Sequence, residues 1–222
     1  MKKTLSILFL LMLSISVCAQ QKDVTRFLGI PVDGSKSEMI RKLKAKGFES
    51  NPYDEGILTG EFNGTMVNVY VLTNNNKVFR IVLEDVYVQD KHDIVMRFNR
   101  LCHQFENNGK YVCDDDFAIP IGEDIEYEMD VNGKRYEAGY YQKLSDTTAM
   151  LNEFKEVSLK ITNSGLGLDA TEEERYKWAE SVVLSMPIFK RLVWFKIDES
   201  YGEYKILMYY DNEYNRANGE DL

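Results

Sequence analysis

The sequence predicts an α+β protein whose antiparallel sheet is built from helix-then-hairpin units, with the helices packed mainly on one face. Three observations predict this class. Segments with helical spacing begin at recognisable caps, alternating segments flank Asn-Gly turns, and few connections are long. A doubly wound parallel sheet is disfavoured, because it needs continuously apolar strands joined by crossovers.

The first helix is expected over residues 36–46. Ser35 and Glu38 have the spacing of a capping box, in which the serine oxygen accepts a hydrogen bond from the Glu38 amide. Apolar residues follow at helical spacing, basic residues occupy the last turns, and Gly47 is a natural stop.

Three strands should follow as an antiparallel meander. Residues 57–62 lead into Asn63-Gly64, a strong signal for a two-residue hairpin turn. Residues 65–72 form the second strand, in which valines alternate with other residues. After a turn of three asparagines, residues 77–84 form the third strand.

A second helix-then-hairpin unit begins at Asp90, which can cap a helix that ends near Gly109. Strands are expected at 125–131 and 134–141, on either side of Asn132-Gly133. The order repeats that of the first unit without a residue-level repeat, so a duplication is suggested only by the pattern. The apolar positions of this helix are Ile94, Val95, Phe98, Leu101, Cys102 and Phe105.

The C-terminal third of the chain contains a third, weaker helix-then-hairpin pattern. Residues 164–169 are expected to form a loop, and 171–174 a capping box before a helix that Pro187 stops. A last hairpin is expected from strands 191–197 and 203–210. The stretch 144–161 is ambiguous, since residues 150–156 suggest a helix and 157–161 a strand, and the polar tail 211–222 should be irregular.

The N-terminus has the anatomy of a secretory signal peptide. Lys2 and Lys3 precede an apolar run that is too short to span a bilayer. Cleavage is expected after Ala19, whereas lipidation at Cys18 is disfavoured by the bulky Val17 before it. We therefore expect a periplasmic or secreted protein without an integral membrane span.

This reading divides the chain into a signal peptide, 1–19, and a mature domain, 20–222. The mature domain contains two candidate sub-units, 24–88 and 89–222.

The composition is that of a soluble globular protein, with 44% hydrophobic and 28% charged residues. The formal net charge of −9 disfavours nucleic acid as a partner, because an acidic chain repels phosphate backbones. The acidity itself is explained by solubility and marks no particular substrate.

Two cysteines lie beyond the signal, Cys102 and Cys113. In an oxidising compartment the pair predicts a disulfide, and Gly109 lets the segment between them turn back. The alternative is two thiols, with Cys102 buried on its helix as a small hydrophobic residue.

The run FLGIPVDGSKSEMIRKLKAKGF at 27–48 and the ending YYDNEYNRANGEDL resemble a group of secreted proteins of unknown function from Bacteroidetes-type bacteria. The resemblance is strongest over 27–48 and 205–222. More distantly, a capped helix followed by a meander resembles the units of β-lactamase-inhibitor-protein-like folds and of small outer-membrane assembly lipoproteins. That likeness implies protein binding, and it implies no catalytic residues.

Candidate chemistry is sparse, and we expect no cofactor and no metal site. His92 and His103 stand about 16 Å apart along one helix face, too far to share an ion. A thiol–base pair of Cys113 with His103 lacks the local signatures of cysteine enzymes. The acidic run 114–116 lacks calcium-loop spacing.

The C-terminal hairpin is rich in aromatic residues, and alternation puts rings on both of its faces. One face must be core, and the other could present Tyr and Trp to a partner. The candidate binding residues are Trp194, Tyr201, Tyr204, Tyr209 and Tyr210. We therefore expect a non-enzymatic binding or accessory protein for an envelope protein or a glycan. The alternative is a carboxylate-dependent hydrolase of glycan or peptide.

Overall fold

The computed structural model describes residues 23–113, 115–143 and 186–217, together with residues 155, 159, 171–174, 177 and 178. In this part of the chain, helices accompany an eight-stranded antiparallel sheet, so the predicted α+β class and antiparallel sheet are confirmed. The expected signal peptide and the expected loop at 164–169 lie outside the described residues, as does nearly all of the stretch 144–161.

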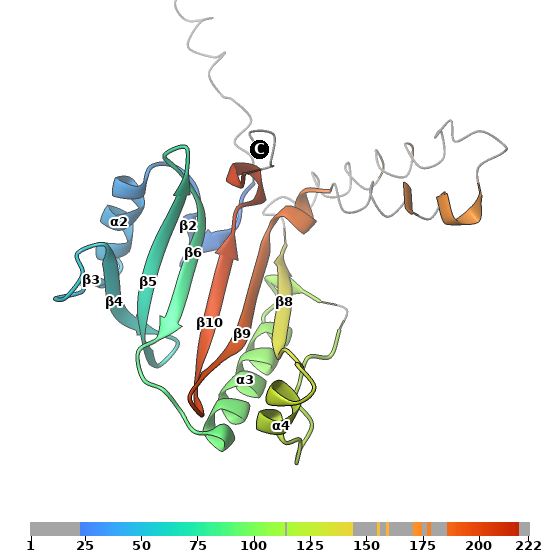
Figure 1. Cartoon of the computed structure of the whole chain (residues 1–222). Helices are drawn as coiled ribbons and strands as arrows, with labels where there is room; N and C mark the ends of the chain where they lie inside the picture. The colour runs from blue at the N-terminus through green and yellow to red at the C-terminus, as the bar shows by residue number, and fades with distance from the viewer. Residues whose placement is uncertain are drawn as a thin grey trace, which may run out of the picture.

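The sheet has the strand order β3-β4-β5-β6-β10-β9-β8-β7, and it forms one continuous surface (Figure 1). The pairing of β6 with β10 joins the early meander to the C-terminal hairpin, with Val82 opposite Tyr209. The strands are β3 (Glu49–Ser50), β4 (Ile57–Phe62), β5 (Thr65–Asn74), β6 (Lys77–Asp85), β7 (Tyr111–Val112), β8 (Glu137–Gln142), β9 (Leu192–Ser200) and β10 (Glu203–Asp211).

The meander and the last hairpin lie close to where the sequence predicts them. Asn63 and Gly64 have φ values of 53° and 74°, the left-handed pair that a tight hairpin turn requires. A separate two-stranded ribbon, β1 (Arg26–Phe27) and β2 (Ile30–Pro31), docks on the sheet through Phe27. The ring of Phe27 lies 4.9 Å from that of Tyr210.

Two predicted helices are present, α2 (Lys36–Lys44) and α3 (Lys91–Glu106). The Ser35 Oγ accepts from the Glu38 amide at 3.3 Å, and the Asp90 carboxylate caps α3 by accepting from the Asp93 amide at 2.9 Å. Within the described residues, no helix is long and apolar enough to cross a membrane.

The expected capping box at 171–174 is also formed. The Thr171 hydroxyl accepts from the Glu174 amide at 3.3 Å, and the Glu174 carboxylate accepts from the Thr171 amide at 2.9 Å. Pro187 begins a short 3₁₀ helix, η1 (Pro187–Lys190), which leads directly into β9. A second one, η2 (Glu213–Asn215), follows β10.

The predicted strand at 125–131 is wrong, because these residues form the helix α4 (Ile125–Asp130). Asp124 caps this helix through the Tyr127 amide, and acidic side chains in the first turn suit its dipole. Gly133, at φ 64°, turns the chain after the helix and not between two strands. The predicted strand at 134–141 becomes the shorter β8, whose partners are β9 and β7.

One hydrophobic core combines the buried sides of both long helices with the inward-facing strand residues. α2 contributes Met39 and Leu43, and α3 contributes Ile94 and Phe98 among others. At its centre the rings of Phe105 and Tyr140 stack at 4.7 Å. Aromatic rings thus connect the second long helix to the C-terminal half of the sheet.

The predicted disulfide between Cys102 and Cys113 is absent from the structure. Cys102 is wholly buried on α3, where burial raises the pKa of its thiol to about 11. The Cys113 Sγ lies beyond β7 and is hydrogen-bonded to the backbone of Asp115, 3.3 Å from the amide nitrogen. The two sulfurs therefore occupy different surroundings, one in the core and one in a loop.

Candidate functional site

The strands of the large sheet alternate between core residues and a second set of side chains, most of which are half-buried. On β9, Val193, Phe195 and Ile197 enter the core, whereas Trp194 and Lys196 do not. We call the second set the outer sheet face. Its residues on the six longer strands are Ile57, Thr59, Asn68, Tyr70, Arg80, Val82, Glu84, Lys205, Leu207, Tyr209, Asp211, Leu192, Trp194, Lys196, Asp198, Glu137, Gly139 and Tyr141.

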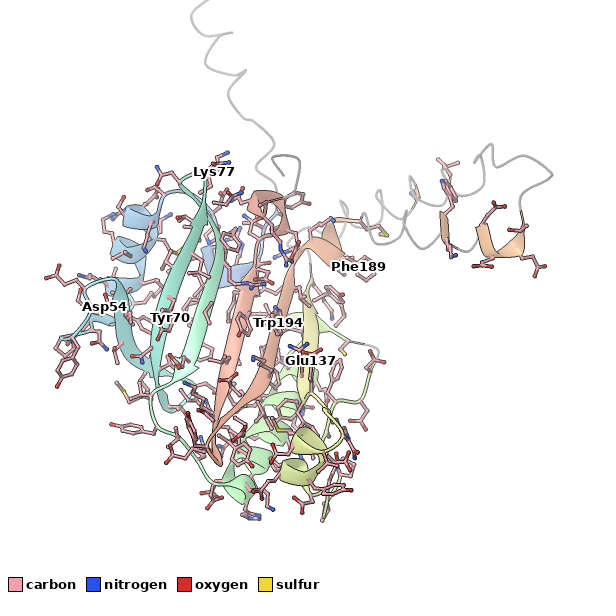
Figure 2. The ribbon with its side chains drawn as sticks, viewed as in Figure 1. Asp54, Tyr70, Lys77, Glu137, Phe189 and Trp194 are labelled. Atoms are coloured by element: carbon pink, nitrogen blue, oxygen red, sulfur yellow. The ribbon has the colours of Figure 1, made fainter. Side chains whose placement is uncertain are left out.

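A row of apolar and aromatic residues crosses this face from strand to strand. Cross-strand register aligns Tyr70, Val82, Tyr209, Trp194 and Gly139, which we call the aromatic row. The rings of Trp194 and Tyr209 stack with centroids 4.0 Å apart and planes 12° apart. Figure 2 shows Tyr70 and Trp194 on the same side of the sheet.

Arg80 and Asp211 hold the aromatic stack in place. The guanidinium of Arg80 binds both carboxylate oxygens of Asp211, at 2.5 and 2.7 Å, and lies 5.1 Å from the Tyr209 ring centre. The Trp194 Nε1 donates to the same carboxylate at 3.0 Å. The polar groups around the stack therefore satisfy one another and hold the two rings in place.

A second polar group lies beside the row. The Tyr70 hydroxyl donates to Glu84 at 2.5 Å, and Lys205 forms an ion pair with the same carboxylate. Burial, followed by the bond to Glu84, raises the pKa of Tyr70 to about 12. On β9, Lys196 pairs with Asp198 at 2.8 Å. The outer sheet face therefore combines apolar area with charged groups that are already paired with one another.

The five aromatic residues that the sequence predicts for binding lie in three different environments. Trp194 and Tyr209 lie in the aromatic row. Tyr204 and Tyr210 are only 2% and 4% exposed, so including them among surface residues was wrong: their strand positions face the core. Tyr201 is fully exposed in the turn between β9 and β10, with φ 56°.

Sequence reasoning missed Tyr70, Arg80, Glu84 and Asp211. Alternation within the predicted strands places Tyr70 opposite to the core valines, which was an available signal. The contacts of Arg80 with Asp211 were not available, because they depend on the pairing of β6 with β10 across more than a hundred residues.

The carboxylates of the outer sheet face include those of Glu84, Asp211, Asp198 and Glu137. Glu84 is held by Tyr70 and Lys205, and Asp211 by Arg80 and Trp194, so both carboxylates are engaged by donors. Among the described residues, no group of three or more His, Cys, Asp or Glu side chains could hold a metal ion.

Comparison of the chain with protein families, with curated proteins and with solved structures finds no match.

Proposed function

We propose that the chain is an exported, non-enzymatic binding protein that docks on a folded partner protein through its outer sheet face. The observation that carries this proposal is the aromatic row, which lies on side chains that the core does not use. Stacked Trp and Tyr rings held by an Arg are the residue types that protein interfaces favour at their centres.

We also propose that both long helices pack on the inner side of the sheet. α2 contacts β5 and β6, and α3 contacts β9 and β10, and the buried residues of both helices join the inward strand residues in one core. Packing both helices on that inner side leaves the opposite side to a partner. In Figure 1, α3 passes behind β9 and β10.

A protein suits this face better than a glycan. Sugars are recognised through hydrogen bonds to many hydroxyls, and the charged groups around the row already bind one another. Six strands spaced by about 4.8 Å give a face about 24 Å wide, close to the scale of a standard interface. A flat surface of paired charges around fixed rings is complementary to another protein surface.

The test is affinity purification of the tagged mature protein from its native envelope, with Val82→Lys as the key variant. Val82 lies in the middle of the aromatic row, and the new ammonium lies near Glu84, so the fold should tolerate it. Val131→Lys, at the exposed end of α4, is the matched control.

We expect a defined protein that wild type and Val131→Lys retain and that Val82→Lys loses, with an affinity at least tenfold weaker. Circular dichroism should show all three proteins folded. Equal capture by Val82→Lys would contradict the proposal. Retention of the wild type on an envelope polysaccharide, weakened only by Val82→Lys, would instead assign the face to a glycan.

A further inference from the structure

A second surface lies along the solvent side of α3, away from the outer sheet face. There a groove of about 1,070 Å³ runs between the helix and the loop 119–123. The helix wall is the stripe of His92, Met96, Arg100 and His103, and the groove continues to Asn107. From His92 to Asn107 it is about 22 Å long, at 1.5 Å per helical residue.

The groove is built before any ligand binds. The Asn99 side chain donates to the Ile119 carbonyl at 2.9 Å and accepts from the Ile119 amide at 2.8 Å. This pair of bonds fixes the loop wall against the helix. A preformed groove spares a ligand the cost of ordering the protein.

The groove presents apolar side chains to solvent. Ile121 on the loop is fully exposed, and Met96 on the helix is 58% exposed. Val95 and Ile119 lie deeper between them. Large apolar side chains that face each other across a hollow mark a surface that another apolar group can cover.

The charge of the groove is opposite to that of the chain. Arg100 lines the groove, and within the described residues its guanidinium has no hydrogen bond or ion pair. Lys91 pairs with Asp124 at 3.0 Å, and the one carboxylate in the lining, Glu123, is bound by Lys134 and Tyr136. Among the described residues, this cation of the groove thus has no carboxylate partner, although the formal charge of the protein is −9.

We infer that this groove docks an acidic amphipathic helix of a partner protein, with a carboxylate of that helix on Arg100. The groove length matches about 15 helical residues. A helix satisfies its own backbone, whereas an extended peptide needs backbone partners that a wall of side chains does not supply. The concave shape favours a single helix over a flat membrane surface.

The test measures fluorescence polarisation of two labelled 15-residue peptides at about 0.15 M salt, where long-range charge effects are screened. Both peptides carry Leu at helical spacing; one has Glu on its borders and the other has Lys. Wild type should bind the Glu peptide at least tenfold more tightly than the Lys peptide. Net charge alone predicts the reverse order, so this preference reports on the groove.

The charge-reversal variant Arg100→Glu should invert the preference, and Met96→Asp should weaken binding of both peptides at least tenfold. Arg41→Glu, an exposed arginine on α2, is the matched control and should behave as wild type. Val82→Lys should also leave peptide binding unchanged, which separates this inference from the proposed function.

An unchanged preference in Arg100→Glu would overturn the inference. So would the absence of peptide binding together with sedimentation of the wild type, but not Arg100→Glu, on phosphatidylglycerol vesicles. That result would assign the groove to an anionic lipid surface.

Discussion

Arg97 and Asp85 show how a single pair of charges ties α3 to the sheet. Their exposures are 5% and 3%, and the guanidinium binds both carboxylate oxygens at 2.6 and 2.5 Å. Asp85 also accepts from the Ile206 amide at 3.2 Å, and Arg97 donates to Thr65 at 2.9 Å. The pair therefore links one helix to three strands, and each ion satisfies the other in a site with little water.

Substitution Arg97→Met should lower the free energy of unfolding by about 3–5 kcal/mol, because it leaves the Asp85 carboxylate buried without its cation. Urea denaturation measures the change. The neighbouring exposed Arg100→Met is the control and should stay within about 0.5 kcal/mol of wild type. Equal unfolding midpoints for the two variants would show that the buried pair is not formed.

Tyr70 should make stability depend on pH in the alkaline range. Its pKa in the folded protein is raised from 10.0 to about 12, so folding favours the neutral phenol. The resulting stability is fully present below pH 10 and is lost as the pH rises toward 12.

Titration of tyrosinate absorbance checks this sign. Tyr70→Phe should remove a component that ionises near pH 12, whereas Tyr53→Phe, at a fully solvent-exposed position, should leave that component in place. If both variants lost the same component, the bond between Tyr70 and Glu84 would be in doubt.

At the scale of elements, β4 approaches the turn after α2 so closely that only glycine fits at position 60. A Cβ added to Gly60 would lie 2.7 Å from the ring of Phe48, which is buried. Gly60→Ala should therefore cost about 1–3 kcal/mol of stability through overpacking, measured by thermal or urea unfolding.

Gly109→Ala is the matched control for this packing argument. An added Cβ at Gly109 meets nothing within 4 Å, and its φ is not in the left-handed region. This variant should be neutral or should stabilise the protein by about 0.4–1 kcal/mol, because alanine restricts the unfolded chain. A loss of stability at Gly109 similar to that at Gly60 would contradict the packing explanation.

The elements also show what local sequence determines. Ser35, Asp90 and Thr171 were each predicted as caps, and each accepts the expected amide, because a cap involves residues three positions apart. Asp124 caps α4 by the same local chemistry, whereas the Asn-Gly pair that follows predicts a hairpin turn. In α4, capping and helix-dipole effects outweigh that turn signal.

At the scale of the whole molecule, long-range pairing decides the candidate site. Alternation predicts that Tyr209 and Tyr210 point to opposite sides of the sheet, and they do. It does not reveal which side is core, because that depends on where the helices pack. The pairing of β6 with β10 brings Arg80 to Asp211 and completes the aromatic row, and no local pattern encodes it.

Because of the same pairing, the early meander and the late hairpin share one face, and we propose that this face receives a partner. Hydroxyl-radical footprinting of the wild-type protein, free and bound to the protein it captures, tests this most directly. We expect protection of Tyr70, Trp194 and Tyr209 together, with Tyr53 still reactive. Protection confined to residues of α2 and α3, with the three rings as reactive as in the free protein, would contradict it.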